Sequence, residues 1–254
     1  MNILFILTLF LLVLLIVVGV YGFLVYRKTL VSEQLILRAQ SFEIESEDHS
    51  VSILVLGDSN AFAVGADKPS DGVAGLLATY VKATYVENQS APGTGASGLF
   101  AQAKRARLPR YTYILIQVGG KDMGRFHNPT KMARFLREGL EILPAFDHMI
   151  MTTAGNVAAA PFIPWFLKPF YTRLNHSYHR AFSKVVGEHG GLYVNIYRDP
   201  KNDAFVQNPE RYFAADKLHL SSEGYRLWFE RILEELGKVR DLPPQTTDLS
   251  AKSR

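Results

Sequence analysis

The sequence predicts an α/β domain in which helices cover both faces of a parallel sheet, preceded by one apolar helix at the N-terminus. From residue 51 onward, short apolar runs rich in β-branched residues alternate with helical patterns, which favours a parallel sheet. The runs are continuously apolar, as in strands buried on both faces. Residues 3–26 contain no charged side chain, which predicts the additional helix. We therefore expect a three-layer α/β/α sandwich built on five parallel strands.

Composition narrows the classes of protein to which this chain can belong. It has 254 residues, 48% of them apolar, which suits one catalytic domain with an appendage. The net charge is only +4 and no long basic run carries interleaved aromatic residues, which argues against nucleic acid as a partner. Cysteine is absent, which excludes disulfides, thiolate metal sites and a cysteine nucleophile.

The first 28 residues predict a retained membrane anchor. About 20 apolar residues cross the hydrocarbon core of a bilayer as a helix. A cleaved signal peptide predicts a basic start, a shorter apolar stretch and a small-residue cleavage site, whereas Met1-Asn2 precede this stretch and Arg27-Lys28 follow it. These cations and Arg38 favour a cytoplasmic domain, but a single N-terminal anchor before a large domain often orients the other way. The side of the membrane therefore stays open.

Three further segments follow the anchor, residues 1–28. Residues 29–50 are expected to form a tether, whose first part could continue the helix before the polar, acidic stretch 41–50 ends it. Residues 51–239 form the predicted catalytic domain. Residues 240–254 are polar and carry two prolines, which predicts a disordered tail.

The apolar runs and helical patterns give the expected elements of the domain. Strands are predicted at Val51–Leu56, Ala83–Glu87, Tyr113–Val118, His148–Thr153 and Leu192–Tyr197. Helices are predicted at Asp71–Val81, Ser97–Arg107, Pro129–Leu143, Tyr171–Glu188 and Ser222–Val239. Ligands of open parallel sheets bind outside the carboxyl ends of the strands, so the residues that follow each strand are candidate site residues.

The first predicted strand stops abruptly at Gly57-Asp58-Ser59. Alone, this tripeptide is most often a turn. A serine hydroxyl becomes a nucleophile only beside a base, which in turn needs an orienting partner. Asp216 and His219 stand three residues apart near the C-terminus, so one loop could supply both. Ser59 is therefore the candidate nucleophile, with His219 as the base and Asp216 as its partner.

Four segments of the chain together resemble the GDSL, or SGNH, hydrolases. The matching stretches are "VLGDSNA", "NQSAPGTGA", "ILIQVGGKDM" and "DKLHLSSEGY", in the family's order. The resemblance covers about residues 51–239 and implies a flavodoxin-like topology and hydrolysis of a carboxylic ester by a Ser-His-Asp triad, with no metal or organic cofactor. It further implies that the amides of Ser59 and Gly93 form an oxyanion hole.

One position departs from the family pattern. The third motif usually reads Gly-x-Asn-Asp, with the asparagine amide donating to the oxyanion, whereas this chain has Lys121 there. A lysine ammonium can also donate a hydrogen bond, and its charge favours an oxyanion. It is longer and more flexible than an asparagine amide, so the donor is less preorganised. We keep Lys121 as a candidate third oxyanion donor.

The resemblance admits lipid esters, simple acyl esters and O-acetyl groups on carbohydrate, and an anchor would place the enzyme near lipid or envelope glycan. Two alternatives remain open: an O-acyltransferase using the same site, and a catalytically inactive, membrane-anchored binding module. The oligomeric state is left undetermined by the sequence.

Two other stretches of the sequence contain candidate site residues. His176 and His179 stand at helical spacing, but no carboxylate or cysteine completes a metal-site pattern, so packed or solvated histidines are expected. Residues 158–171 are markedly apolar, and their three prolines should prevent one regular helix. They could form a packed insertion, an acyl-binding wall or lid, or a membrane contact.

Overall fold

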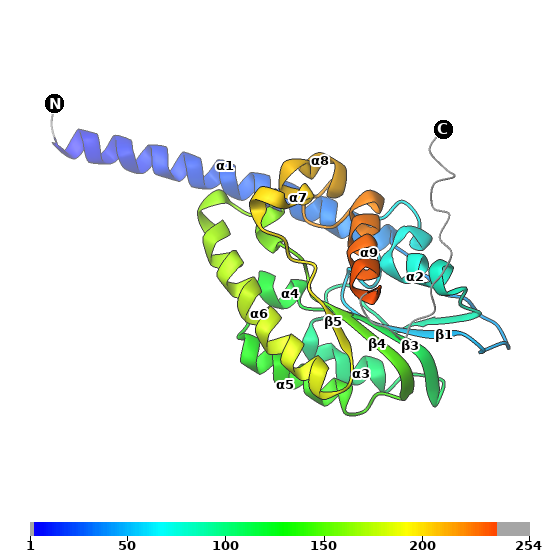
Figure 1. Ribbon diagram of the computed structural model, residues 1–254. Coiled ribbons are helices and arrows are strands. Elements are labelled where there is room, and N and C mark those ends of the chain that lie inside the picture. Colours follow the sequence, from blue (N-terminus) through cyan, green and yellow to red (C-terminus); the bar gives the residue numbers. More distant parts are fainter. Residues whose placement is uncertain (1–2, 238–254) are drawn as a thin grey trace.

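The computed structural model describes residues 3–237, in which a long N-terminal helix projects from an α/β domain (Figure 1). This helix, α1, spans Ile3–Arg38. By length and composition, the segment Leu7–Arg38 could cross a membrane, as an anchor or as a signal sequence. The predicted tail at residues 240–254 lies outside the described residues.

The domain is built on five parallel strands, as the sequence predicts. They are β1 (Ser52–Gly57), β2 (Tyr85–Asn88), β3 (Arg110–Gln117), β4 (Ala145–Thr152) and β5 (Leu192–Val194). Their spatial order is β2-β1-β3-β4-β5, and every neighbouring pair is parallel. The chain passes from β1 to the edge strand β2 and then returns to the other side of β1. The order therefore reverses between β1 and β3, which is where open α/β sheets bind ligands.

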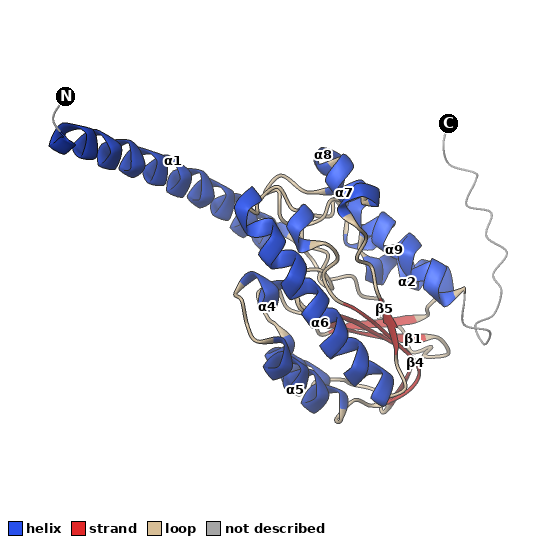
Figure 2. Cartoon of the chain, turned by 60° about the vertical axis from the view of Figure 1, so that its left-hand side comes forward, coloured by secondary structure: helices blue, strands red, loops and turns tan. Residues whose placement is uncertain are grey.

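Successive residues of β1 are buried in two separate cores, which makes the molecule a three-layer sandwich. Ile53 and Val55 pack in the core beneath α2 (Val73–Val81) and α9 (Ser222–Leu236). Leu54 points to the opposite face, toward α3 (Leu99–Ala103), α5 (Pro129–Leu140) and α6 (Lys168–Glu188). Figure 2 shows α2 and α9 on one side of the sheet and α5 and α6 on the other. Burial on both faces explains why the strands lack polar alternation.

Two predicted elements are shorter than their apolar patterns suggest. The helix expected over Ser97–Arg107 is a 3₁₀ turn, Ala96–Gly98, followed by α3, after which the chain makes tighter turns up to Ala106. The backbone N–H of Arg107 then donates to the buried carboxylate of Glu87, at 3.1 and 3.2 Å, instead of to a helical carbonyl. Strand β5 ends at Val194 because the Asn195 side chain accepts the N–H of Tyr197 at 3.1 Å.

The chain also forms short elements without a periodic signal. The helices are α4 (Gly120–Gly124), α7 (Ala204–Gln207) and α8 (Pro209–Tyr212). The further 3₁₀ turns are Pro69–Asp71, Val157–Ala159, Trp165–Leu167 and Pro200–Asn202. Elements of three to five residues are too short for hydrophobic periodicity to reveal.

Residues 29–50, expected to be a tether, lie against the domain. The last turns of α1 bury one face in part, at helical spacing from Lys28 through Ser32 to Ile36. Beyond the helix, Ile44 forms an antiparallel bridge with Val86 of β2, with two backbone hydrogen bonds of 3.0 Å.

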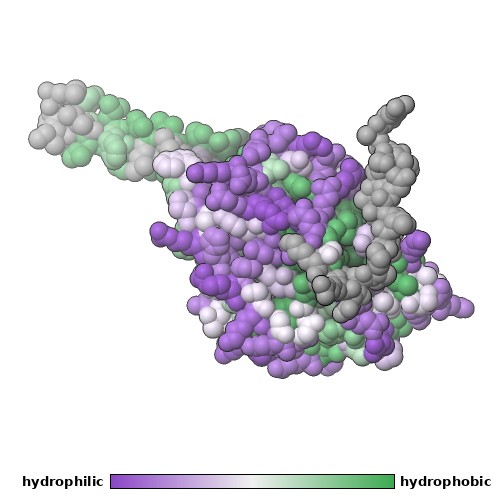
Figure 3. Space-filling view, in the orientation of Figure 1, coloured by the Kyte–Doolittle hydropathy of each residue, from purple (hydrophilic) through white to green (hydrophobic). Residues whose placement is uncertain are grey.

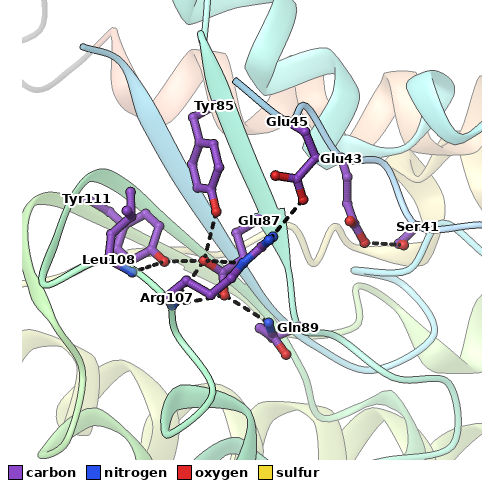
Figure 4. Close-up of polar contacts among 9 residues, drawn as sticks. All are labelled: Ser41, Glu43, Glu45, Tyr85, Glu87, Gln89, Arg107, Leu108 and Tyr111. Carbon is purple, nitrogen blue, oxygen red and sulfur yellow. Dashed lines mark hydrogen bonds and ion pairs between the residues drawn. The ribbon is translucent and has the colours of Figure 1, made fainter. Parts of the chain in front are cut away.

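A buried carboxylate fixes this segment to the sheet edge (Figure 4). Glu87 accepts hydrogen bonds from Tyr111 and Gln89, and it forms an ion pair of 3.5 Å with Arg107. Arg107 also pairs with Glu45 at 2.9 Å. The buried carboxylate of Glu87 therefore has a partner for its charge. Arg107, which pairs with both Glu87 and Glu45, holds the segment after α1 against the domain.

Candidate active site

A glycine ends β1 and turns the chain into the site. Gly57 has φ +141°, and a Cβ there would lie 1.9 Å from the carbonyl oxygen of Gln117. Its N–H donates to the Gln102 side chain at 2.8 Å, and its carbonyl accepts from the same side chain at 2.9 Å. A residue without a side chain is required at this position, and the turn puts Ser59 at the rim of the sheet.

Most of the predicted site residues meet in one cavity of about 360 Å³. Ser59, Gly93, Lys121 and His219 all line it. Ser59 and Gly93 come from the loops after β1 and β2, Lys121 comes from α4 just after β3, and His219 comes from the loop before α9. Residues from four separate stretches of the chain thus converge at the carboxyl edge of the sheet, where the strand order reverses.

Asp216 lies behind His219 and is fully buried. Its Oδ2 is 2.5 Å from His219 Nδ1, and its Oδ1 accepts the backbone N–H groups of Leu218 and His219 at 3.0 Å each. These contacts fix the imidazole with Nδ1 toward the acid and leave Nε2 for the cavity. Burial acts to raise the pKa of Asp216, but the hydrogen bonds from His219 and other donors hold that pKa at about 2.

The structure adds a fourth donor to this carboxylate that the sequence did not reveal. Ser32, on α1, donates its hydroxyl to Asp216 Oδ2 at 2.5 Å, across 184 positions of sequence. Ile36, one turn further along α1, lines the cavity. No sequence motif marks Ser32 as a site residue. In the structure it shares the partly buried face of α1 with Lys28 and Ile36.

Asp58 is a second buried acid, next to Ser59. Its two carboxylate oxygens accept the N–H groups of Asn60 at 2.9 Å and Gly120 at 3.2 Å. Burial is the main cause that raises the pKa of Asp58, from 3.8 to about 6; the nearby Asp122 carboxylate acts in the same direction, and the two N–H groups act against it. The side chain therefore joins the loops after β1 and β3 beneath the cavity.

The loop that carries Gly93 is held in place from beneath. Asp122, almost fully buried, accepts the N–H of Ala96 at 2.8 Å and lies 3.2 Å from His127 Nδ1. A Cβ at Gly95 would approach the Asp122 carboxylate to 2.2 Å. Gly93 itself has φ +75° and open space where a side chain would stand. The loop thus presents its backbone, rather than side chains, to the cavity.

Lys121 contacts this loop directly. Its Nζ donates a hydrogen bond to the carbonyl oxygen of Gly93. The ammonium has three donors, so one bond to the loop leaves others for a ligand in the cavity. Two of the three residues that the sequence suggests as oxyanion donors, Gly93 and Lys121, are therefore in contact.

The sequence matches the GDSL-like Lipase/Acylhydrolase family over residues 55–227. The chain belongs to this family. It is therefore an ester hydrolase of the GDSL/SGNH type, and the match contains Ser59, Asp216 and His219. Among proteins with curated descriptions, none matches the sequence significantly.

Solved structures share the fold of this GDSL/SGNH hydrolase. A GDSL-like lipase from Parabacteroides merdae is similar with a TM-score of 0.57 and 17% identity, over 77% of this chain and 99% of that one. TesA is similar with a TM-score of 0.54 and 19% identity, over 74% and 98%. The esterase EstA from Pseudoalteromonas sp., in a structure inhibited by monoethylphosphonate, is similar with a TM-score of 0.52 and 19% identity, over 75% of this chain and 98% of that one.

The apolar segment 158–171 forms one wall of the cavity in this hydrolase. It is broken into two 3₁₀ turns before α6, as its three prolines predict. The lining residues from this segment are Ala160, Phe162, Ile163 and Tyr171. Further apolar lining comes from Phe205, Phe213, Leu218 and Trp228. The cavity therefore combines a polar part, which contains Ser59, Lys121 and His219, with an extended apolar wall.

His176 and His179 lie apart from this site. The ring of His176 packs edge-on against Tyr197 at 4.6 Å, and the ring of His179 packs against Tyr193 at 5.1 Å. Within residues 3–237, no three His, Asp or Glu side chains are grouped so that they could hold a metal ion.

The Ser32 hydroxyl should support turnover through Asp216. We expect Ser32→Ala to lower kcat by about threefold to tenfold with little change in KM, because it removes one hydrogen bond from a buried charged group. Ser32→Thr, which keeps the hydroxyl, should restore most of the loss. Thr29→Ala is the matched control, since the Thr29 hydroxyl bonds only its own helix, at Val25. Equal kcat values for wild type and Ser32→Ala in ester hydrolysis assays would contradict the expectation.

Asp58 should make the fold less stable as pH rises. The folded state holds its proton more tightly than the unfolded chain, so its contribution is full below about pH 4 and is lost as pH rises through about 6. Between pH 4 and 7, the free energy of unfolding should fall by about 2 kcal/mol more in wild type than in Asp58→Asn. Chemical denaturation across this range measures it.

The quantity to compare is the slope of the free energy of unfolding against pH in the two proteins, because Asp58→Asn also lowers stability at every pH. An amide oxygen can accept only one of the two N–H groups, from Asn60 and Gly120, that separate oxygens of Asp58 accept. Asp216 titrates below this window, since its pKa is held at about 2. Parallel stability curves for the two proteins would show that Asp58 is not the group responsible.

Proposed function

We propose that Ser59, His219 and Asp216 form a catalytic triad that hydrolyses a carboxylic ester. The observation that carries the proposal is the cavity itself: Ser59 and His219 line it together, and His219 is bonded through Nδ1 to a buried carboxylate. A hydroxyl, an imidazole and an orienting acid in this order are the parts that nucleophilic acyl transfer needs.

The reaction follows from these contacts. Ser59 Oγ attacks the ester carbonyl carbon while His219 Nε2 accepts the hydroxyl proton. The imidazolium then protonates the leaving alkoxide, which departs as the alcohol. Water attacks the acyl-enzyme, His219 accepts its proton, and that proton returns to Ser59 Oγ as the carboxylic acid leaves. Asp216 stays ionised throughout, which its low pKa supports.

The oxyanion would be bound by the backbone amides of Ser59 and Gly93 and by the ammonium of Lys121. Gly93 and Lys121 line the same cavity as Ser59 and contact each other. Donors fixed before the reaction stabilise the developing charge without reorganisation. The Gly93 carbonyl reduces the freedom of the Lys121 side chain, which partly compensates for its length.

The substrate that fits this cavity carries an apolar acyl group. Phe162, Ile163 and Tyr171 offer an apolar wall near Ser59. Burial of apolar surface favours binding by roughly 25 cal/mol per Å². Acyl and lipid esters suit this wall better than an O-acetyl group, which is too small to reach along it.

Helix α1 is proposed to be a retained membrane anchor. Its mean hydropathy reaches 2.8 over the most apolar window, and none of that window is buried in the domain. Its other end is part of the site, through Ser32 at Asp216 and Ile36 at the cavity. A helix that completes the site at one end argues for retention rather than removal as a signal sequence.

Ser59 should be the residue that carries the acyl group. A fluorophosphonate should label the wild-type protein once, and Ser59→Ala should lose both the label and ester hydrolysis. The nearby control Ser97→Ala should keep both, because Ser97 is exposed and outside the cavity lining. Labelling of folded Ser59→Ala would contradict the assignment. A folded wild-type protein that takes no label would favour a binding module.

Lys121 should act on the rate more than on binding. We expect Lys121→Ala to lower kcat by about 10²–10³ with a small change in KM, the usual loss for one oxyanion donor. Lys121→Asn should recover part of the rate, because it restores an amide donor at the position where the family usually has one. Steady-state kinetics on a soluble acyl ester measures both. Full activity of Lys121→Ala would mean that Lys121 only holds the Gly93 loop.

A further inference from the structure

Four aromatic side chains form an exposed cluster beside the cavity. This aromatic patch consists of Phe126, Trp165, Phe166 and Phe170, each about half exposed or more, with Trp165 81% exposed. The rings touch in pairs: Phe126 lies 5.2 Å from Phe170, and Trp165 lies 5.9 Å from Phe166. Contiguous exposed apolar groups of this kind mark an interaction surface.

The aromatic patch is connected to the cavity wall. The ring of Tyr171, which lines the cavity, lies 5.1 Å from Phe126 and 6.2 Å from Phe170. Phe126 is held with φ +56°, a conformation that costs free energy for a residue with a side chain. An apolar path therefore leads from the exposed rings to the wall near Ser59.

The aromatic patch lies beside α1, near the end of its charge-free stretch. Lys28 Nζ donates to the carbonyl of Pro161 at 3.4 Å and lies 5.6 Å from the centre of the Phe162 ring. Burial, together with the Tyr21 hydroxyl of α1, raises the pKa of Tyr171. Figures 1 and 2 both show the start of α6 next to α1. Residues 161–171 thus run alongside residues 21–28.

This position coincides with the expected surface of a bilayer. Residues 3–20 rise about 27 Å as a helix, close to the ~30 Å of a hydrocarbon core. The free part of α1 is apolar on its surface, whereas the surface over the domain is mostly polar (Figure 3). Tyr21 and Tyr26 then fall at the lipid–water boundary, where tyrosine and tryptophan are enriched.

Basic side chains accompany the aromatic patch. Arg125 precedes Phe126, Lys168 lies between Phe166 and Phe170, and Arg27 ends the charge-free stretch. Among the residues that the structure describes, none of these three forms an ion pair with a carboxylate. Cations next to interfacial aromatics match the phosphates of lipid headgroups.

We propose that the aromatic patch sits in the interfacial layer of the same leaflet that α1 enters, so that the apolar wall of the cavity faces lipid. The ester that reaches Ser59 would then be drawn from that leaflet with its acyl chain along the wall. This inference rests on the proposed membrane anchor and esterase site. It adds a second point of membrane contact and an orientation of the domain.

Trp165 is a built-in probe for the test. The chain has two tryptophans, and the other, Trp228, is only 5% exposed. The full chain is placed in nanodiscs of phosphatidylcholine and phosphatidylglycerol whose acyl chains are brominated near the headgroup. The emission of wild type minus that of Trp165→Phe isolates the Trp165 signal. Quenching by brominated lipid is compared with quenching by aqueous iodide.

The matched control puts an indole on the far side of the domain. In the Trp165→Phe background, Phe100→Trp places it on α3, which lies away from α1 in Figure 1. Phe100 is 46% exposed, so an indole there meets water. We expect brominated lipid to quench Trp165 at least threefold more than the introduced indole, and iodide to do the reverse.

Each other outcome overturns the proposal. Trp165 quenched by iodide and not by brominated lipid places the aromatic patch in water, and quenching by neither places it under a protein surface. A separate measurement tests the proposed function: fluorophosphonate labelling in the same nanodiscs shows whether Ser59 is a reactive nucleophile. Release of the chain from nanodiscs by high salt would report loss of the anchor. A labelled, retained chain with Trp165 in water refutes the patch alone.

Discussion

The close approach of Gly57 to β3 is the constraint on which the site depends. With φ +141° and no room for a Cβ, the chain leaves β1 in a direction that only glycine allows. The Gln102 side chain hydrogen-bonds to both the N–H and the carbonyl of Gly57, so these backbone groups keep partners where strand pairing ends. Since β1 is buried on both faces and cannot shift, the position of Ser59 follows from the packing of the sheet.

Two buried acids flank Ser59 and His219, and their surroundings push their pKa values apart. Burial and a nearby carboxylate raise the pKa of Asp58 to about 6, although two backbone N–H groups act to lower it. Burial opposes ionisation of Asp216 as well, yet a histidine, a serine and two backbone N–H groups hold its pKa at about 2. The difference in donors gives them different tasks: Asp58 joins two loops, and Asp216 can remain charged beside an imidazole.

The sequence predicted what depends on periodicity and on local motifs. Apolar runs report burial directly, so they predict the five buried strands and the helices over them. Ser59, Gly93 and Lys121 share a cavity because they follow strand ends that meet at one edge. His219 is predicted by its spacing from Asp216 instead. Contacts between residues far apart in the sequence produce no periodic pattern or local motif from which they could be predicted. The hydrogen bond from the Arg107 N–H to Glu87 and the short helix α4 both depend on tertiary packing. The hydrogen bond from Ser32 joins positions 184 apart, which no local pattern encodes.

Helix α1 links the orientation of the domain to the geometry of its site. Its partly buried face carries Lys28 at Pro161, Ser32 at Asp216 and Ile36 at the cavity, in successive turns. No glycine or proline interrupts residues 23–38, so this part of the helix has no hinge residue. A rotation of the helix by one residue would move Ser32 about 100° away from Asp216. The contacts that hold the domain at a fixed angle to α1 therefore also hold the carboxylate behind His219.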